Sequence, residues 1–209
     1  MKLANYSHVI WDWNGTLLDD VAIAMGITNS LLEERGLSQL QLAEYREVFD
    51  FPIIEYYQSI GFDPAEFDQL AEEFFSRFQA ARSSYRLLPG TAELLEQLRL
   101  HGCRQSVLSA TREHDLIPAV AGLGIAGYFC SIHGIADRHA RSKLERGRRS
   151  LQELGCDPQR TVLIGDTTHD SEVAQALGID CILIAAGHQS RRRLMQQSAM
   201  VFDSASDLL

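Results

Sequence analysis

Several side chains that could do chemistry follow short apolar stretches of the chain. Asp12 comes directly after residues 7–11, and Asp166 comes directly after residues 162–165. A carboxylate can attack phosphorus as a nucleophile, and carboxylates near one another can hold a divalent cation that neutralises phosphate charge. A lysine and a hydroxyl can hold the transferring oxygens. The residues of these types at such positions are Asp12, Ser109, Lys143, Asp166 and Asp170.

The pattern from residue 87 onward predicts the elements that must position these side chains. Short apolar runs alternate with amphipathic stretches there, as is typical of βα units on a parallel sheet. Because open parallel sheets build their active sites at the carboxyl ends of strands, Asp12, Ser109 and Asp166 are expected to meet at one edge. Beyond the strand before Asp12, we expect strands at 105–109, 127–132, 161–165, 181–185 and, weakly, 199–202, and helices at 91–100, 113–121, 143–154 and 171–177.

Residues 20–86 carry a different pattern, which predicts helices and no strand. Asp20 is expected to cap a helix that ends at Gly36, and Pro52 and Pro64 each stand where a further helix could begin. Apolar residues from Phe67 to Phe78 recur at helical spacing and are expected to form a helix-bundle core. We therefore predict an α/β core domain from residues 1–19 and 87–209, interrupted by a helical domain at 20–86.

Composition and charge narrow the classes of function. The net charge is −9 and the pI is about 5.2, so a nucleic-acid partner is not expected. The 21–85 stretch holds eleven acids and four arginines, which favours a solvated acidic face, and Arg191 to Arg193 are expected to form a solvated helix face. We expect no membrane association and a cytoplasmic location, because neither an 18-residue apolar run nor a signal-peptide pattern is found. The four cysteines lack metal-ligand spacing and are expected to be reduced, buried thiols. The pattern does not indicate an oligomeric state.

Four short motifs, in order along the chain, resemble those of the haloacid dehalogenase superfamily. They are Asp12-Trp13-Asn14-Gly15-Thr16, Leu108-Ser109, Lys143, and the Gly165 to Asp170 stretch, with Leu88-Pro89-Gly90-Thr91 as the return from the helical insert. The chain is similar to phosphoglycolate phosphatase-like members over nearly its whole length. This resemblance implies a Rossmann-like parallel sheet core with helices on both faces and an inserted all-helical cap domain.

The resemblance also implies a role for each matching residue. Asp12 would be the nucleophile that forms an aspartyl-phosphate, and Mg²⁺ would be held by Asp12, Asp166 and the backbone carbonyl of Asn14. Asp170 would hold metal-bound water or orient Lys143. Lys143, one of only two lysines in the chain, would balance the anionic cluster. Ser109 and Thr16 would bind the phosphate, together with backbone N–H groups at residues 13–15. Arg46 is a further candidate for substrate binding, as are Tyr56 and Tyr57.

Asn14 departs from the family pattern, in which the residue two after the nucleophile is usually an aspartate that protonates the leaving oxygen. An amide cannot transfer that proton, and general acid–base catalysis contributes roughly 10²–10⁴-fold. His169 is the nearest substitute by sequence, and Asp19 and Asp20 are further candidates. If Asn14 slows hydrolysis of the intermediate, an Asn14→Asp variant should turn over faster.

These observations predict a magnesium-dependent phosphatase that hydrolyses a small phosphorylated metabolite through an aspartyl-phosphate and is slowed by Asn14. The alternative is a catalytically weakened protein of the same fold that binds Mg²⁺ and phosphate for regulation. Phosphonate hydrolysis is excluded, because relatives with that activity use a lysine of the cap and this insert contains none. A phosphoglycolate substrate is the expectation at the level of the family.

Overall fold

The protein is built around a parallel sheet of six strands. The structure is a computed structural model and describes residues 3–135, 141–197 and 200–209. The strand order is β3-β2-β1-β4-β5-β6, and every neighbouring pair is parallel. The predicted Rossmann-like α/β fold is therefore confirmed. The strands are β1 (His8–Trp11), β2 (Arg104–Arg112), β3 (Ser131–Ile135), β4 (Thr161–Gly165), β5 (Asp180–Ile184) and β6 (Val201–Phe202).

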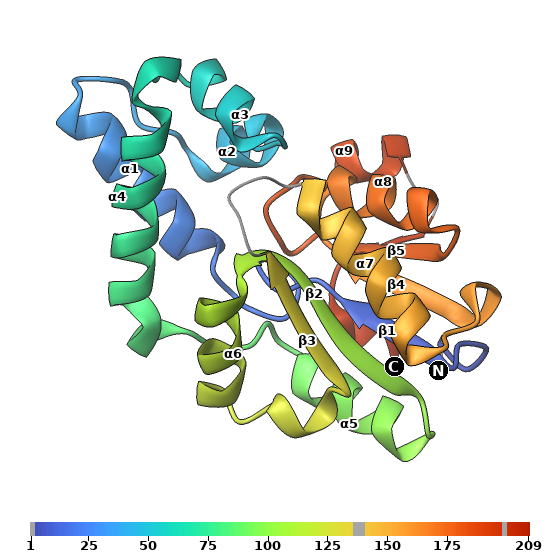
Figure 1. Cartoon of the computed structure of the whole chain (residues 1–209). Helices are drawn as coiled ribbons and strands as arrows, with labels where there is room; N and C mark the ends of the chain where they lie inside the picture. Colours follow the sequence, from blue (N-terminus) through green and yellow to red (C-terminus); the bar gives the residue numbers. More distant parts are fainter. Residues whose placement is uncertain (1–2, 136–140, 198–199) are drawn as a thin grey trace.

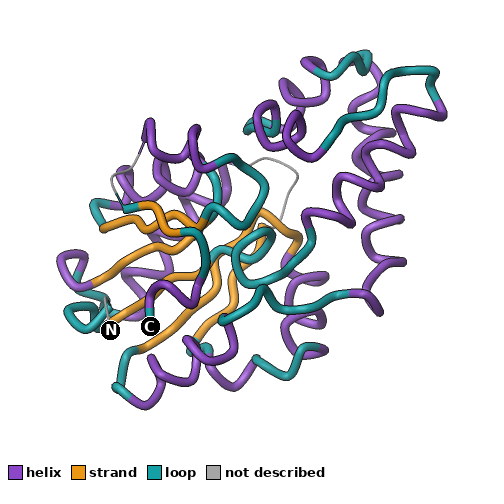
Figure 2. The backbone as a smooth tube through the Cα atoms, turned by 180° about the vertical axis from the view of Figure 1, so that it is seen from behind, coloured by secondary structure: helices purple, strands orange, loops and turns teal. Residues whose placement is uncertain are grey.

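Helices cover both faces of this sheet, because strand side chains alternate between the two faces and most are apolar. Val9 and Trp11 of β1 belong to the core under α5 (Thr91–Leu100) and α6 (Glu113–Gly122). Ile10 points to the opposite face, where it packs in a cluster with α8 (Thr168–Leu177) and α7 (Arg141–Leu154). A smaller cluster links α9 (Arg191–Gln197) to β5 and β6. Figures 1 and 2 show the sheet between these helices.

A helical segment, residues 20–86, leaves the sheet after β1 and returns before α5 (Figure 1). It has a hydrophobic cluster of its own, in which Leu31, Leu32 and Leu70 are fully buried. The helices α1 and α4 pack against each other along their length. The segment comprises α1 (Val21–Glu34), α2 (Leu42–Val48), α3 (Ile53–Ser59) and α4 (Phe67–Ala80), with 3₁₀ turns η1 (Pro64–Glu66) and η2 (Ala81–Ser84).

The structure corrects the predicted elements at two places. The strand expected at 127–132 lies at Ser131–Ile135. The first residues of the expected strand belong instead to the turn η3 (Ala126–Tyr128), in which the Tyr128 N–H donates to the Ile125 carbonyl. The helix α2 was not predicted from the sequence. The expected strand at 199–202 is found as β6, although residue 199 lies outside the described part of the chain. Two further 3₁₀ turns, η4 (Pro158–Arg160) and η5 (Ala205–Leu208), precede β4 and close the chain.

Two predictions about individual side chains were also wrong. Cys130 is exposed and Cys156 and Cys181 are only partly buried, whereas Cys103 is buried as expected; all four cysteines are free. Asp20 precedes α1, but its side chain makes no capping hydrogen bond, because it accepts hydrogen bonds from residues 14 and 15 instead. The side chain therefore belongs to the site described below.

Arginines from both partners hold one side of the helical segment against the core. The Arg46 guanidinium donates to the carbonyls of Gly187 (3.0 Å) and Ala186 (2.7 Å). In the other direction, Arg193 of α9 donates to the Phe49 carbonyl (2.6 Å) and to Asp50 (2.7 Å). Arginines 191–193 were expected to form a solvated helix face, and for Arg193 that expectation was wrong.

None of the helices in the described part of the chain is long and apolar enough to cross a membrane.

Candidate active site

Three of the predicted side chains meet at the carboxyl edge of the sheet. Trp11 of β1 is in register with Val107 of β2 and with Ile164 of β4. The next residue, Asp12, donates its backbone N–H to the Ile164 carbonyl (2.8 Å). Asp12 and Asp166 therefore leave adjacent strands at the same level, and Ser109 lies on the other side of Asp12 on β2. All three are buried.

Lys143 reaches this edge from α7 and is 3% exposed. Its ammonium donates to Asp12 Oδ1 at 2.6 Å and to Asp170 Oδ1 at 2.7 Å. Asp170 is itself held by the start of α8, since its Oδ2 accepts from the N–H (3.0 Å) and the hydroxyl (2.7 Å) of Thr167. This capping box fixes the Asp170 carboxylate, which in turn orients the lysine.

Asp166 is enclosed by backbone from two loops. Its Oδ1 accepts from the Thr16 hydroxyl at 3.0 Å, and its Oδ2 accepts from the His188 backbone N–H at 2.6 Å. A Cβ on Gly15 or Gly187 would come within 2.2 Å or 2.1 Å of Asp166 Oδ2. Gly15 also has a φ of +67°, which other residues rarely adopt. Only glycine at both positions leaves room for this carboxylate.

The protonation behaviour of the carboxylates reflects their crowding. Burial raises the pKa of Asp12 to about 8, with contributions from Asp170 and Asp166, against the lowering effect of the Lys143 ammonium. Burial likewise raises the pKa of Asp166 to about 6. Burial would also raise the pKa of Asp170, but Lys143 holds it below its usual value. Burial therefore disfavours negative charge at Asp12 and Asp166, and a further cation would offset that effect.

The carboxylate cluster fits a divalent cation. Oxygen atoms of Asp12, Asp166 and Asp170 lie within 4.8 Å of one another, and all three residues are buried. An all-oxygen donor set of this kind is what Mg²⁺ prefers. Both oxygens of Asp170 already accept hydrogen bonds, from Lys143 and Thr167, so this side chain is better suited to orienting its neighbours than to binding an ion directly.

Asn14 is fixed by hydrogen bonds on both ends of its amide. Its Nδ2 donates to Asp20 Oδ2 at 2.7 Å, and its Oδ1 accepts from the Thr111 hydroxyl at 2.7 Å. The other Asp20 oxygen accepts from the Gly15 backbone N–H, also at 2.7 Å. The Gly15 N–H was expected to bind phosphate together with its neighbours, but in the structure it donates to Asp20 instead.

Asp20 forms a buried unit with two residues that the sequence motifs did not single out. His188 Nε2 lies 3.4 Å from Asp20 Oδ1, and His188 Nδ1 lies 2.8 Å from the Tyr45 hydroxyl. Burial alone would lower the pKa of His188, but the carboxylates of Asp20, Asp166 and Asp12 raise it to about 9. His188 comes from the loop after β5 and Tyr45 from α2, so they meet only through the contact between core and helical segment.

His169, the nearest substitute acid by sequence, contacts other residues. Its ring stacks on Phe51 with centroids 4.8 Å apart, and its Nδ1 lies 3.5 Å from Glu172. It does not line the cavity described below. Asp19 is exposed and does not line it either, whereas Asp20 does. Of the three sequence candidates, the structure brings only Asp20 to the side chain of Asn14.

The predicted phosphate-binding residues are brought together only in part. Ser109 lines the cavity and is 1% exposed, and its oxygen accepts from the Thr111 backbone N–H at 3.0 Å. Thr16 is fully buried against Asp166. Arg46, expected to bind substrate, does not line the cavity because its guanidinium is bonded to the 186–187 backbone. Its position makes it a link between helical segment and core.

A cavity of about 840 Å³ lies between the carboxyl edge of the sheet and the helical segment. Its polar end contains Asp12, Asn14, Ser109, Lys143 and Asp166. Its other end is formed by aromatic and aliphatic side chains of the helical segment. The stripe expected as a bundle core is confirmed except at Phe75: Leu70 and Phe78 are buried in hydrophobic clusters against which Phe67 and Phe74 pack, whereas Phe75 lines the cavity outside any cluster.

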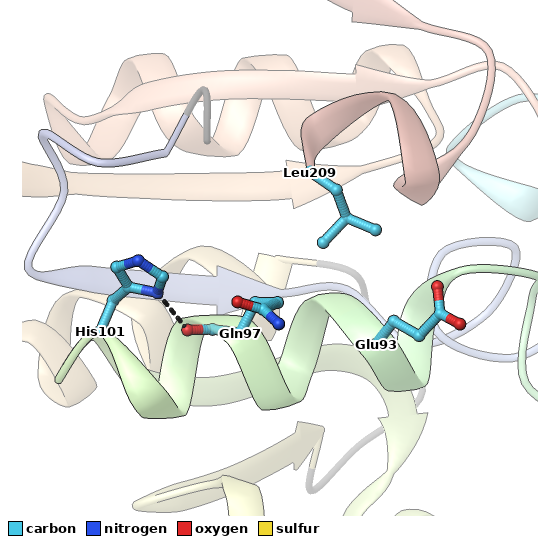
Figure 3. A pocket seen from close by; sticks show the side chains of 4 residues that line it. All are labelled: Glu93, Gln97, His101 and Leu209. Carbon is cyan, nitrogen blue, oxygen red and sulfur yellow. Dashed lines mark hydrogen bonds between the residues drawn. The ribbon is translucent and has the colours of Figure 1, made fainter.

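A second pocket, of about 400 Å³, lies beside α5 and shares no residue with the first. Figure 3 shows its four lining residues, with His101 Nδ1 bonded to the Gln97 carbonyl at 2.7 Å. The other two are Glu93 and Leu209. His101 Nδ1 is thus already hydrogen-bonded to the backbone of residue 97. The one acidic side chain that lines this pocket, Glu93, cannot hold a divalent cation by itself. The chemistry therefore belongs to the larger cavity.

Known proteins share both the sequence pattern and the fold. Residues 9–184 match the model of the family described as haloacid dehalogenase-like hydrolase. A phosphoglycolate phosphatase from Synechococcus elongatus is 23% identical over 96% of this chain and 94% of its own. A 5'-nucleotidase from Pseudomonas aeruginosa is 27% identical over 90% of this chain and 87% of its own. The structure of a haloacid dehalogenase-like hydrolase from Streptococcus pneumoniae, 19% identical, superposes with a TM-score of 0.83 and covers 98% and 97% of the two chains.

These comparisons confirm the predicted resemblance to phosphoglycolate phosphatases, which are phosphoric monoester hydrolases, and the predicted fold. The family match covers both the carboxylates at the ends of β1 and β4 and the lysine between them. The chain belongs to the haloacid dehalogenase-like hydrolase family.

Proposed function

We propose that this protein is a magnesium-dependent phosphatase that hydrolyses a small phosphorylated metabolite through an aspartyl-phosphate on Asp12. The main support is the placement of the Asp12 carboxylate, which lies 2.6 Å from the Lys143 ammonium at the polar end of a large cavity. A buried carboxylate fixed by a cation is a suitable nucleophile for phosphorus, and covalent catalysis divides the hydrolysis into two easier steps.

Two displacements at phosphorus would complete the reaction. In the first, an Asp12 oxygen forms a bond to phosphorus while the bond to the leaving alcohol oxygen breaks, and that oxygen takes a proton from solvent water. In the second, water attacks the phosphorus and gives up a proton to the solvent, which releases inorganic phosphate and restores the Asp12 carboxylate. Lys143 and the Ser109 hydroxyl would bind the phosphate oxygens in both steps. The side chains that hold these groups in place, Asp170 and Thr167, need not touch the substrate.

Mg²⁺ fits the carboxylate set, with Asp12, Asp166 and the Asn14 backbone carbonyl as the proposed protein ligands. The bound cation would neutralise phosphate charge and make the phosphorus more susceptible to attack. It would also favour ionised Asp12 and Asp166, whose pKa values burial raises. Thr16 and the backbone N–H of His188 would keep the Asp166 carboxylate oriented.

The Asn14 side chain would act through hydrogen bonds only, because an amide cannot transfer a proton to the leaving oxygen. A catalytically weakened regulatory protein is not favoured, since the nucleophile, the lysine, the hydroxyl and the acidic cluster are all assembled.

We further propose that residues 20–86 form a cap domain over the site. The names of two relatives refer to different substrates, phosphoglycolate and 5'-nucleotides, so family membership does not identify the leaving group.

Phosphate release from a panel of phosphate monoesters, measured with and without Mg²⁺, tests the proposal. Wild-type protein should release phosphate only with Mg²⁺, and Asp12→Asn should abolish the release. Asp19→Asn is the matched control, because Asp19 is an exposed carboxylate that does not line the cavity. Release that survives in Asp12→Asn, or that is unaffected by chelation, would rule out this mechanism.

A further inference from the structure

Three bulky apolar side chains that are only partly buried line the cavity without belonging to any hydrophobic cluster of the described residues. They are Phe51 before α3, Ile54 in α3 and Phe75 in α4. Core packing therefore does not account for their position. Apolar surface that faces a cavity gains free energy when a ligand removes it from water.

These side chains share one cavity with the catalytic groups. The volume of about 840 Å³ lies in the upper part of the range of roughly 300–1,000 Å³ for small-molecule sites. A phosphoryl group at Asp12 and Lys143 would occupy only the polar end. The remaining space, towards Phe51, Ile54 and Phe75, is available to the group that leaves.

The cationic side chains that line the cavity, among the described residues, each have an acidic partner. Arg112 lies 3.0 Å from Glu72, with its guanidinium 4.6 Å from the centre of the Phe75 ring. Arg82 lies 3.9 Å from Asp115. The other two, Lys143 and His188, are paired with the carboxylates described above. A carboxylate on the leaving group would have to compete for one of these cations and would also meet Asp115 and Glu145 in the cavity wall.

We infer that the preferred substrates are phosphate monoesters whose leaving alcohol is apolar and cyclic, bound against Phe51, Ile54 and Phe75. The inference rests on the proposed phosphatase function and gives its substrate class. It differs from the family-level expectation of phosphoglycolate, whose leaving group is small and anionic. Ring-containing groups are favoured because the aromatic wall can contact a flat face.

Turnover of matched esters separates this preference from chemical reactivity. Ethyl, cyclohexylmethyl and benzyl phosphate all release primary alcohols that are poor leaving groups, so differences in kcat/KM report mainly binding of the alcohol. With Mg²⁺ we expect kcat/KM for benzyl phosphate to exceed that for ethyl phosphate by at least about tenfold, the scale of hydrophobic pocket selectivity. Phosphoglycolate should be hydrolysed no faster than ethyl phosphate. Asp12-dependent turnover that favours phosphoglycolate over benzyl phosphate would overturn the inference and leave the phosphatase function intact.

Two variants connect the preference to the named wall. Ile54→Ala and Phe75→Ala should each reduce the ratio of benzyl to ethyl kcat/KM about threefold or more. Ile117→Ala is the matched control, because Ile117 is 46% exposed on α6 and does not line the cavity. A ratio that neither cavity variant changes would contradict the assignment of the wall.

A binding measurement keeps the inference testable if the phosphatase function itself fails. Benzylphosphonate and methylphosphonate carry the same phosphoryl charge and need no turnover. Calorimetry with Mg²⁺ should show benzylphosphonate binding about tenfold more tightly. Equal affinity for the two phosphonates would overturn the inference, whatever the result of the activity assays.

Discussion

At the residue scale, the pair formed by Asn14 and Asp20 is the main departure from the expected site. The motif places an amide where the family usually has a carboxylate, and the structure places a carboxylate 2.7 Å from that amide, six residues later. The Asn14 amide donates to one oxygen of the Asp20 carboxylate, and the other oxygen accepts from the backbone N–H of Gly15. A negative charge next to the nucleophile loop is thus present at Asp20, although residue 14 is uncharged.

This geometry changes the expected effect of Asn14→Asp. The single substitution would place two carboxylates in contact, and like-charge contacts cost about 2–4 kcal/mol. We expect lower stability and no gain in turnover, contrary to the expectation from the sequence alone. The double variant Asn14→Asp/Asp20→Asn restores one charge and one donor, and should recover most of the stability. Urea unfolding of both variants measures this, and a single variant as stable as wild type would contradict the pairing.

At the element scale, the motifs predicted the strand ends well but not the contacts between distant segments. Asp12, Ser109 and Asp166 could be placed because each follows or ends an apolar run, and parallel strands end at one edge. His188 and Tyr45 could not, because their 2.8 Å contact joins α2 to the loop after β5, 143 residues away. The spacing of apolar residues along the chain gives no information about such a contact. The same reason explains why Arg193 was mistaken for a solvated residue.

Arg193 should therefore contribute to stability through the docking of the helical segment. Arg193→Met removes hydrogen bonds to the Phe49 carbonyl and to Asp50, and should lower the free energy of unfolding by about 1–3 kcal/mol. Arg191→Met is the control, since Arg191 is largely exposed and pairs with Asp203. Thermal unfolding and limited proteolysis within 20–86 provide the measurement. Equal stability of the two variants would show that this contact is not important.

The first strand makes stability depend on pH through His8. Burial, helped by Arg104, lowers the pKa of His8 to about 4, and its Nε2 lies 2.8 Å from the Ser106 hydroxyl. The unfolded chain binds a proton near pH 6.5 and the folded chain does not, so stability is lost as the pH falls from about 6.5 towards 4. The loss attributable to His8 should reach about 2–3 kcal/mol at pH 4. His8→Gln should flatten this part of the stability profile, and an unchanged profile would exclude His8 as its source.

At the scale of the whole molecule, the site depends on both parts of the chain. The core supplies the nucleophile and the acidic cluster, while the helical segment supplies most of the apolar cavity wall. The α/β class and the helical insert could be predicted from patterns of apolar residues, since these set burial on the sheet and helices. The cavity could not, because Phe75 and Leu70 both belong to the apolar pattern of residues 67–78, yet only Leu70 is fully buried.

Cation binding at the acidic cluster should stabilise the entire fold. A ligand that binds only the folded chain adds about 2.7 kcal/mol at a concentration one hundred times its Kd. Saturating Mg²⁺ should therefore raise the Tm of wild-type protein, and Asp166→Asn should remove most of that increase. Thermal unfolding with added Ca²⁺ provides a comparison of ion preference. The same Mg²⁺-dependent increase in Asp166→Asn would place the ion elsewhere.

Trapping the intermediate shows whether Asp12 becomes phosphorylated during turnover. Wild-type protein would be mixed with Mg²⁺ and an activated aryl phosphate, stopped with acid during turnover, and examined by peptide mass spectrometry. We expect one phosphoryl group on Asp12, formed with an initial burst of released phenol and absent from Asp12→Asn. Phosphate release with Asp12 unmodified throughout turnover would contradict this expectation.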